Sequence, residues 1–263
     1  MTRIEEKFRQ VNQEGRGAFV PYITLGDPDL EGTRQIILEL QAAGADLIEL
    51  GVPFSDPLAD GLVIQRATER SLRHGFTLEK GLALVSEIRQ QIQVPLVLFS
   101  YYNPLFAYGF ENLVREAKER GIDGFLIIDL SVEEAEGPVN MLRGAEIDSI
   151  FLVAPTSSEE RIRKIAAYSS GFIYAVSRMG VTGTQKLVSA EVQSLVKRIR
   201  CHSMLPVVVG FGISEPEHVQ QIWGQAEGVV VGSAIVRCIE QNLEEPDLAR
   251  RVGKFARWLK GGS

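Results

Sequence analysis

Residues 47–61 read Leu47-Ile48-Glu49-Leu50-Gly51-Val52-Pro53-Phe54-Ser55-Asp56-Pro57-Leu58-Ala59-Asp60-Gly61 and join a short apolar run to a long loop. A short, continuously apolar run is typical of a strand that is covered on both faces, as in parallel sheets. One carboxylate, Glu49, lies inside this run. The prolines in the following segment stiffen it as a loop. A buried strand with an acidic residue near its carboxyl end is the first structural prediction.

Short apolar runs of this kind recur along the chain, with segments of helical periodicity between them. One such segment, 33–43, ends at Gly44, and another, 111–120, ends at Gly121. Each has an apolar stripe, a charged face and a glycine stop, which is typical of helices that cover a sheet. The eight expected strands are 18–24, 47–50, 96–100, 124–128, 150–153, 172–176, 207–210 and 229–231.

Eightfold alternation of strand and helix predicts an α/β fold, the (β/α)8 TIM barrel. The alternative is a doubly wound open sheet. No Gly-x-Gly-x-x-Gly motif follows the first expected strand, where 20–26 read VPYITLG, and this disfavours the open sheet. An extra helix at 2–13 is expected to plug the bottom of the barrel. Because no linker of Pro, Gly or Ser interrupts the chain, residues 1–263 are expected to form a single domain.

The composition excludes several classes of protein. The chain has 263 residues, a net charge of −6 and 45% hydrophobic residues, and its calculated pI is about 5.3. An acidic chain is a poor match to nucleic acid or to an anionic membrane. No apolar run approaches the roughly 20 residues that span a bilayer, and the charged N-terminus does not resemble a targeting signal. The isolated Cys201 and Cys238 indicate reduced thiols in a cytoplasmic protein, with no metal site.

Two carboxylates in unlike surroundings are the candidate catalytic pair. Glu49 lies in an apolar strand, whereas Asp60 lies in the polar loop that follows it. Burial favours the protonated form of a carboxyl group, so the two groups can hold different protonation states at one pH. The structural alternative is that Glu49 pairs with an Arg or Lys in the core and that Asp60 only caps a turn.

Two glycine-containing segments follow the last two expected strands and are candidates for a phosphate site. They are 210–214, GFGIS, and 232–236, GSAIV. Glycine allows backbone N–H groups to approach an anion, and barrels commonly hold phosphate after strands seven and eight. Ser233 is expected to cap the helix that begins there and to donate its hydroxyl to the phosphate. The polar, glycine-containing loop 177–184 is long enough to fold over a ligand.

The chain resembles the tryptophan synthase alpha subunit family along its whole length. The resemblance lies in 26–28, 49–61, 102–104, 177–183, 210–213 and 232–234. It implies a carbon–carbon lyase of tryptophan biosynthesis that cleaves indole-3-glycerol phosphate to indole and glyceraldehyde 3-phosphate in the cytoplasm. It implies no metal or organic cofactor in this chain. Pyridoxal phosphate is expected only in a partner beta subunit, which would receive the indole within an alpha2-beta2 heterotetramer.

The resemblance also implies roles for single residues. Glu49 would protonate C3 of the indole ring, and Asp60 would hydrogen-bond the indole N–H. Thr182 would contact the Asp60 loop when the lid closes. Leu62 and Ser131 stand where the family usually has proline. Tyr174 would lie near Glu49. The remaining expected substrate contacts are Tyr22, Phe99, Tyr101, Ile128 and Phe211 around the ring, with Gly183, Gly212, Gly232 and Ser233 at the phosphate.

Three alternatives stay open at the level of the sequence. The chain could be a stand-alone lyase that releases free indole. It could be a non-catalytic module that only activates a beta enzyme. It could also be a different phosphate-binding barrel, such as a sugar-phosphate isomerase, because the glycine segments would serve that function equally well.

Overall fold

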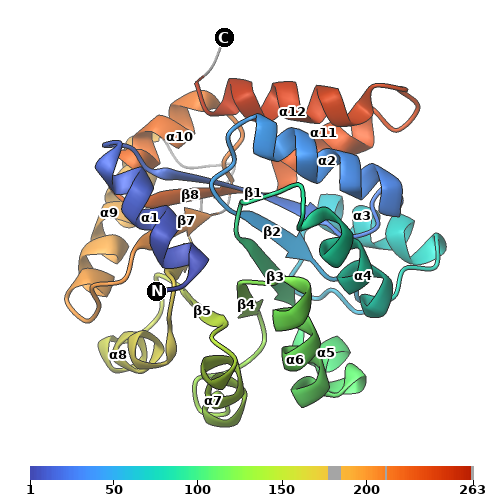
Figure 1. The fold of residues 1–263 in the computed structure, drawn as a ribbon. Helices are drawn as coiled ribbons and strands as arrows, with labels where there is room; N and C mark the ends of the chain where they lie inside the picture. The colour runs from blue at the N-terminus through green and yellow to red at the C-terminus, as the bar shows by residue number, and fades with distance from the viewer. Residues whose placement is uncertain (177–184, 211, 262–263) are drawn as a thin grey trace.

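The structure is a computed structural model, and it describes residues 1–176, 185–210 and 212–261. In this part of the chain eight parallel strands close into one barrel in the order β1 to β8, with β8 paired to β1 (Figure 1). The strands are β1 Ala18–Thr24, β2 Ile48–Gly51, β3 Leu96–Ser100, β4 Gly124–Ile127, β5 Asp148–Val153, β6 Ile173–Val176, β7 Val207–Gly210 and β8 Gly228–Val231.

Helices surround the barrel and connect the successive strands (Figure 1). Their bounds are α1 Arg3–Gln13, α2 Leu30–Ala42, α3 Leu62–Arg73, α4 Leu78–Ile88, α5 Tyr102–Tyr108, α6 Phe110–Arg120, α7 Glu136–Gly144, α8 Glu159–Tyr168, α9 Gln185–Arg200, α10 Pro216–Trp223, α11 Ser233–Gln241 and α12 Leu248–Leu259.

The predicted barrel is confirmed, and the open sheet is wrong. Strands β1, β3 and β7 have the predicted bounds. The other five differ by one or two residues, β2 at both ends and the rest at one end. The pairing of β1 with β8 closes the sheet, because Ala18 lies opposite Gly228 and Val20 lies opposite Val230. A closed barrel leaves no edge strand and places all eight carboxyl ends on one rim.

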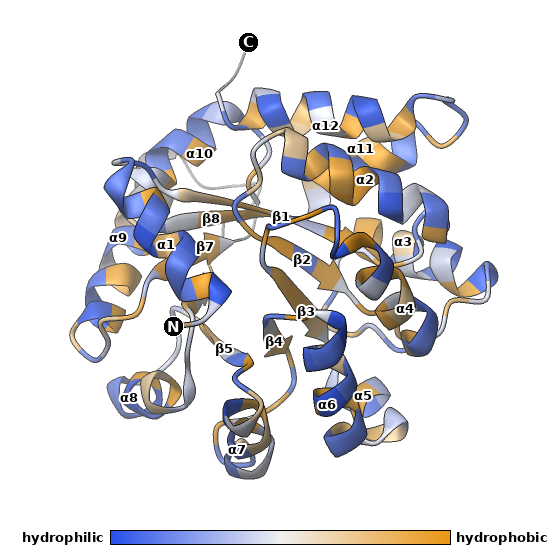
Figure 2. Ribbon diagram, in the orientation of Figure 1, coloured by the Kyte–Doolittle hydropathy of each residue, from blue (hydrophilic) through white to orange (hydrophobic). Residues whose placement is uncertain are grey.

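Two layers of apolar side chains hold the barrel. One fills the space between strands and helices, and the other fills the barrel interior. Figure 2 shows the same division, with hydrophobic colour along the strands and hydrophilic colour on the outer sides of the helices. The continuously apolar strand sequences follow from this, because each strand is covered on both faces.

Helix α1 closes the N-terminal end of the barrel, as predicted. Thr2 caps it in a capping box with Glu5. Its buried side chains, Ile4, Phe8 and Val11, belong to the interior cluster. The rings of Phe8 and Phe172 lie 5.7 Å apart between centroids. The far end of the barrel is left for the loops that follow the strands.

A buried ion pair fixes α3 to the turn after β1. Arg70 donates through Nε to Oδ1 of Asp27 at 2.7 Å and through Nη2 to Oδ2 at 3.0 Å, and Nη1 reaches Glu240 on α11 at 2.9 Å. The side chain of Asp27 is fully buried. Ser71 Oγ adds a 2.6 Å bond to the carbonyl of Leu25. These contacts set the position of α3, whose N-cap, Gly61, follows Asp60 directly.

Arg70→Ala is expected to lower the free energy of unfolding by about 3–5 kcal/mol, because it leaves a buried carboxylate without its partner. Urea unfolding measures the change. The control is Arg73→Ala, which breaks an exposed pair with Glu69 at 3.5 Å and is expected to cost less than about 0.5 kcal/mol. Equal losses in the two variants would contradict the prediction.

Within the described ranges, no helix combines the length and the apolar character that a membrane crossing requires. Cys201 and Cys238 are free thiols, the first exposed and the second half-buried.

Candidate active site

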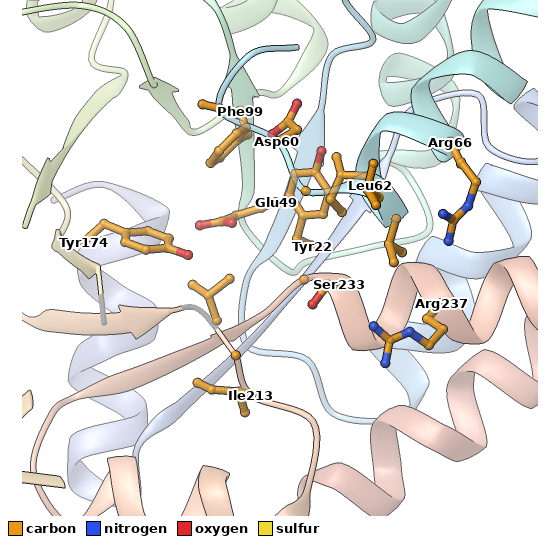
Figure 3. Close-up of a pocket in the computed structure, with 17 residues that line it drawn as sticks. Tyr22, Glu49, Asp60, Leu62, Arg66, Phe99, Tyr174, Ile213, Ser233 and Arg237 are labelled. Carbon is orange, nitrogen blue, oxygen red and sulfur yellow. The ribbon is translucent and has the colours of Figure 1, made fainter. Parts of the chain in front are cut away.

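A cavity of about 580 Å³ opens at the carboxyl end of the barrel (Figure 3). A volume of this size suits a small-molecule ligand, and the carboxyl rim is where barrel enzymes place their chemistry. Its lining comes from the strand ends, from the loop before α3 and from the starts of α3 and α11. The lining residues are Tyr22, Glu49, Ala59, Asp60, Gly61, Leu62, Val63, Ile64, Arg66, Phe99, Tyr174, Gly212, Ile213, Val230, Gly232, Ser233 and Arg237.

Glu49 projects from β2 into this cavity (Figure 3). Glu49 is only 1% exposed, and its Oε1 atom has no hydrogen-bond partner among the described residues. No ion pair to Glu49 is present in the described ranges, so the alternative in which a core Arg or Lys neutralises it is wrong there. A buried polar atom without a partner is costly, and such atoms in native structures commonly serve function.

Burial raises the pKa of the Glu49 carboxyl to about 8. The charged form loses its hydration on burial, and no cation among the described residues compensates the loss. At neutral pH Glu49 therefore carries its proton, and it is an acid placed at the wall of an apolar cavity. This is the protonation state that a general acid requires.

The raised pKa of Glu49 also makes stability depend on pH. An unfolded Glu ionises near pH 4.3, whereas the folded group ionises at about 8. Between these values the folded state binds more protons, so the free energy of unfolding falls as pH rises. Glu49→Gln removes this titration. Urea unfolding at pH 5 and pH 8.5 measures the effect. The free energy of unfolding of Glu49→Gln, relative to that of the parent, should be higher by a few kcal/mol at pH 8.5 than at pH 5. An equal difference between the two proteins at both pH values would contradict this.

Asp60 lies beside Phe99 and above Glu49 in the view of Figure 3, and it is half-buried. Burial raises its pKa to about 6, and a hydrogen bond from Tyr101 opposes the rise. The loop is held by the N–H of Ala59, which donates to the Tyr101 hydroxyl at 2.9 Å, and by Gln65 Nε2, which donates to the Asp60 carbonyl at 2.8 Å. At neutral pH Asp60 is mostly ionised beside a protonated Glu49.

Aromatic side chains wall the cavity between the two carboxyl groups. Tyr22 from β1 and Tyr174 from β6 are 8% and 4% exposed. The rings of Tyr22 and Phe99 meet edge to face at 5.3 Å and 81°, a favourable aromatic geometry. The structure thus brings together Tyr22, Phe99 and Tyr174, three of the six aromatic and aliphatic residues that the sequence analysis expected to contact the substrate. Such walls fit a flat aromatic ligand.

Two glycines give these tyrosines their positions. A Cβ on Gly51, at the end of β2, would lie 2.0 Å from the Tyr22 hydroxyl oxygen. A Cβ on Gly210, at the end of β7, would lie 1.9 Å from the hydroxyl oxygen of Tyr174. Each tyrosine therefore occupies the space of a missing side chain on the next strand.

Tyr101 and Ile128 do not line the cavity, contrary to the prediction. The Tyr101 hydroxyl is bonded to the Asp60 loop, and its ring packs on Phe54 at 5.3 Å. It therefore supports the loop from behind. Ile128 packs against the interior cluster of the barrel. Both positions follow a strand end, but sequence position alone does not say which way a side chain turns after the strand.

Gly212, Gly232 and Ser233 lie together in the cavity wall, at the start of α11 and after β7. Gly212 has a φ of +74°, a conformation that favours glycine. The prediction that Ser233 caps α11 is wrong. Gly232 is the N-cap, Ser233 is the first helical residue, and no side chain caps this end. Since no side chain of the described residues caps this end, the N–H groups at the start of the helix can receive an anion.

Three predicted site residues, Thr182, Gly183 and Phe211, lie outside the described residues, as does the candidate lid 177–184.

Several lining residues were not predicted. Val63 and Ile64 come from the first turn of α3, and Arg66 and Arg237 come from α3 and α11. Arg66 is held by Glu240 through two bonds of 2.6 and 2.8 Å. The helical period after Gly61 signals an inward face on α3, but only the packing of α3 against the barrel decides that this face reaches the cavity. The described residues contain no group of three or more His, Cys, Asp or Glu arranged to hold a metal.

Comparisons with known proteins agree with this geometry. The model of the family "Tryptophan synthase alpha chain" matches residues 8–259. The tryptophan synthase alpha chain of Solibacter usitatus is 50% identical over 262 residues, covering 100% of this chain and 98% of that protein. The crystal structure of tryptophan synthase subunit alpha from Legionella pneumophila superposes with a TM-score of 0.91 at 34% identity, covering 99% and 98% of the two chains. A chain of tryptophan synthase from M. tuberculosis gives a TM-score of 0.88 at 33% identity, covering 99% and 100%. This barrel, with its paired carboxyl groups at the rim, belongs to the tryptophan synthase alpha chain family.

Proposed function

We propose that this chain catalyses the reaction of its family, the retro-aldol cleavage of indole-3-glycerol phosphate to indole and glyceraldehyde 3-phosphate in tryptophan biosynthesis. The observation that carries the proposal is the Glu49 carboxyl group. It is buried, protonated at neutral pH and unpartnered among the described residues, at the wall of an apolar cavity whose mouth holds Asp60.

Glu49 supplies the proton that starts the reaction. Its transfer to C3 of the indole ring makes an indolenine cation, in which the bond from C3 to the hydroxyl-bearing carbon of the side chain is weakened. When that bond breaks, its electron pair returns to the ring and restores indole. The hydroxyl loses its proton to the Glu49 carboxylate and becomes the aldehyde of glyceraldehyde 3-phosphate. The enzyme ends in its starting protonation state.

Asp60 stabilises the positive charge that this protonation creates. Its ionised carboxylate accepts a hydrogen bond from the indole N–H, where the charge of the indolenine is largest. The interaction strengthens as the charge develops, so it favours the transition state over the bound substrate. The pKa values of about 8 for Glu49 and about 6 for Asp60 support this division of roles, because they give one protonated acid and one ionised partner in the same cavity.

The phosphate is assigned to the other end of the cavity. There the backbone of Gly212 and Gly232 and the first turn of α11, with the Ser233 hydroxyl, offer donors to an anion. Tyr22, Phe99 and Tyr174 enclose the ring. Thr182, Gly183 and Phe211 are assigned to the same site from the family resemblance alone.

The family name implies a beta-subunit partner. We further propose an alpha2-beta2 heterotetramer in the cytoplasm, in which pyridoxal phosphate belongs to the beta subunit and this chain uses no cofactor. The rim around the cavity carries exposed apolar side chains, with Leu58 94% and Leu62 72% exposed, and exposed apolar groups at a rim favour association with a protein.

The test is a cleavage assay with indole-3-glycerol phosphate as the substrate. Release of indole by the purified chain, stimulated by a beta subunit, is the expected result. Strong activity that a beta subunit does not change would favour a stand-alone lyase. An indolyl alkyl phosphate should compete with the substrate, because the aromatic walls bind the ring. Lack of both cleavage and competition would overturn the proposed function.

A further inference from the structure

The phosphate end of the cavity has hydrogen-bond donors, but the donors assigned so far carry little positive charge. They are the backbone of Gly212 and Gly232, the first turn of α11 and the Ser233 hydroxyl. A helix N-terminus is equivalent to about half a positive charge, whereas a phosphate monoester carries a charge of about −1.5 to −2 near pH 7. The chain as a whole has a net charge of −6. A phosphate bound here would therefore be stabilised by a full positive charge close to it.

Arg237 lies on α11 one helical turn after Ser233. Residues four apart on a helix share a face, with Cβ atoms about 5–6 Å apart, and helical side chains lean toward the N-terminus. This geometry directs the Arg237 side chain back over the first turn of α11. Both residues are exposed and line the same cavity. In the view of Figure 3 the guanidinium end of Arg237 is turned toward Ser233.

The Arg237 guanidinium has no ion pair or hydrogen bond with another described residue. The acidic side chain one turn further along α11, Glu240, is already engaged by two arginines of α3. Arg66 donates to it at 2.6 and 2.8 Å, and Arg70 donates to it at 2.9 Å. Arg66 also lines the cavity, but Glu240 neutralises its charge. Within the described structure, the charge that remains available to a ligand of the cavity is that of Arg237.

We propose that Arg237 binds the phosphate group of the substrate and supplies the positive charge that the backbone donors lack. This inference rests on the proposed function. An arginine keeps its charge at neutral pH, and its planar fork can give two parallel N–H donors to two phosphate oxygens. The backbone N–H groups and Ser233 position the phosphate, and Arg237 strengthens its binding.

The exposure of Arg237 sets the size of the expected effect. Water and salt screen an attraction between exposed charges, so the gain in affinity is moderate. The gain is confined to ligands that carry a phosphate. The proton transfer at Glu49 takes place at the other end of the cavity, so the chemical step does not depend on Arg237.

The first test is the cleavage of indole-3-glycerol phosphate by Arg237→Gln. We expect KM to rise about fivefold, between the scale of an exposed ion pair and that of a buried charged hydrogen bond. The value of kcat should stay within about twofold, because the lost interaction binds substrate and transition state alike. Arg237→Lys keeps the charge and loses the fork, so its KM should lie between those of the parent and of Arg237→Gln.

The matched control is Arg250→Gln, which removes the same charge from an exposed position on α12 outside the cavity. Its KM and kcat should equal those of the parent. If Arg237→Gln and Arg250→Gln have the same KM, the proposal is overturned. A fall in kcat of Arg237→Gln with an unchanged KM would also overturn it, because the residue would then act on the chemical step.

A binding measurement separates phosphate recognition from support of the cavity wall. The two probes are an indolylpropyl phosphate and the corresponding indolylpropanol, which has the same ring and no phosphate. Titration followed by NMR should give Arg237→Gln a dissociation constant about fivefold higher than that of the parent for the phosphate. The constant for the alcohol should not change. Equal losses for both probes would overturn the proposal.

Salt provides a further readout of the same contact. Raising the salt concentration from about 50 to about 500 mM should weaken binding of the indolylpropyl phosphate more in the parent than in Arg237→Gln, because the variant has lost the screened attraction. An identical salt dependence in the two proteins would overturn the proposal. If the parent binds this probe through Arg237 but does not cleave indole-3-glycerol phosphate, the proposed function fails and the Arg237 assignment stands.

Discussion

Glu49→Gln is expected to lower kcat for cleavage of indole-3-glycerol phosphate by about 10³-fold, within the usual range for loss of a positioned acid. Glutamine fills nearly the same volume but has no acidic proton to give to C3. The buried Oε1 has no partner among the described residues that the substitution would leave unpaired. KM should stay within about twofold, because the proton is transferred only in the transition state. Steady-state assay of indole release measures both constants.

The control for this variant is Glu111→Gln on the exposed side of α6, which should match the parent. Binding of an indolyl alkyl phosphate to Glu49→Gln, with an affinity close to that of the parent, would show that the cavity is intact. If Glu49→Gln keeps more than about a tenth of the parent kcat, Glu49 is not the general acid.

The pH profile of the parent enzyme gives a second check on Glu49. Its acid form is the active one, so kcat/KM should fall as pH rises through about 8. Glu49→Gln should lose this basic limb together with its activity. A basic limb that survives in the residual activity of the variant would assign the titration to another group.

Asp60→Asn is the prediction with the next largest effect, a loss of about 10²-fold in kcat. An amide can still accept the indole N–H, but it carries no charge to stabilise the cation that forms on the ring. The acid limb of the parent, expected near pH 6 where Asp60 takes up its proton, should disappear in the variant. The activity of the parent is therefore expected to be bell-shaped between about 6 and about 8.

Asp56→Asn provides the matched control on the same loop. Asp56 is exposed, and its carboxylate contacts only the hydroxyl of Ser55, at 3.4 Å, in the described structure. Its kcat and acid limb should equal those of the parent. A comparable loss in Asp56→Asn would mean that the loop is sensitive to any change of charge, and Asp60 would then have no special role.

Much of the barrel could be predicted because its signals are local. A continuous apolar run such as 18–24 or 207–210 specifies a strand covered on both faces, and a glycine stop such as Gly121 ends the helix before it. Strand ends were less well predicted where the chain continues apolar beyond the last paired residue, as at Ile128, which follows the pairing of Ile127 with Ser100. There the pairing with the neighbouring strand, and not the residue, decides the boundary.

The candidate site could be located from sequence, since strand ends must meet on one rim of a barrel. The direction in which each side chain points could not be predicted from sequence. Tyr101 turns behind the Asp60 loop, whereas Tyr174 turns into the cavity. Capping at α11 was also misassigned by one position, because Gly and Ser are both suitable N-caps and only the backbone angles choose between them.

The sequence by itself determined the eightfold alternation, the presence of an acidic residue in a buried strand and the glycines near the rim, because each depends on neighbours in the chain. The tertiary structure alone decided that Glu49 meets no cation in the described residues, that Tyr22 occupies the inward space of Gly51, and that Asp60 faces the same cavity. These are contacts between different strands and loops. The pKa of a buried carboxyl depends on every group around it in space, so it is fixed only when the barrel closes.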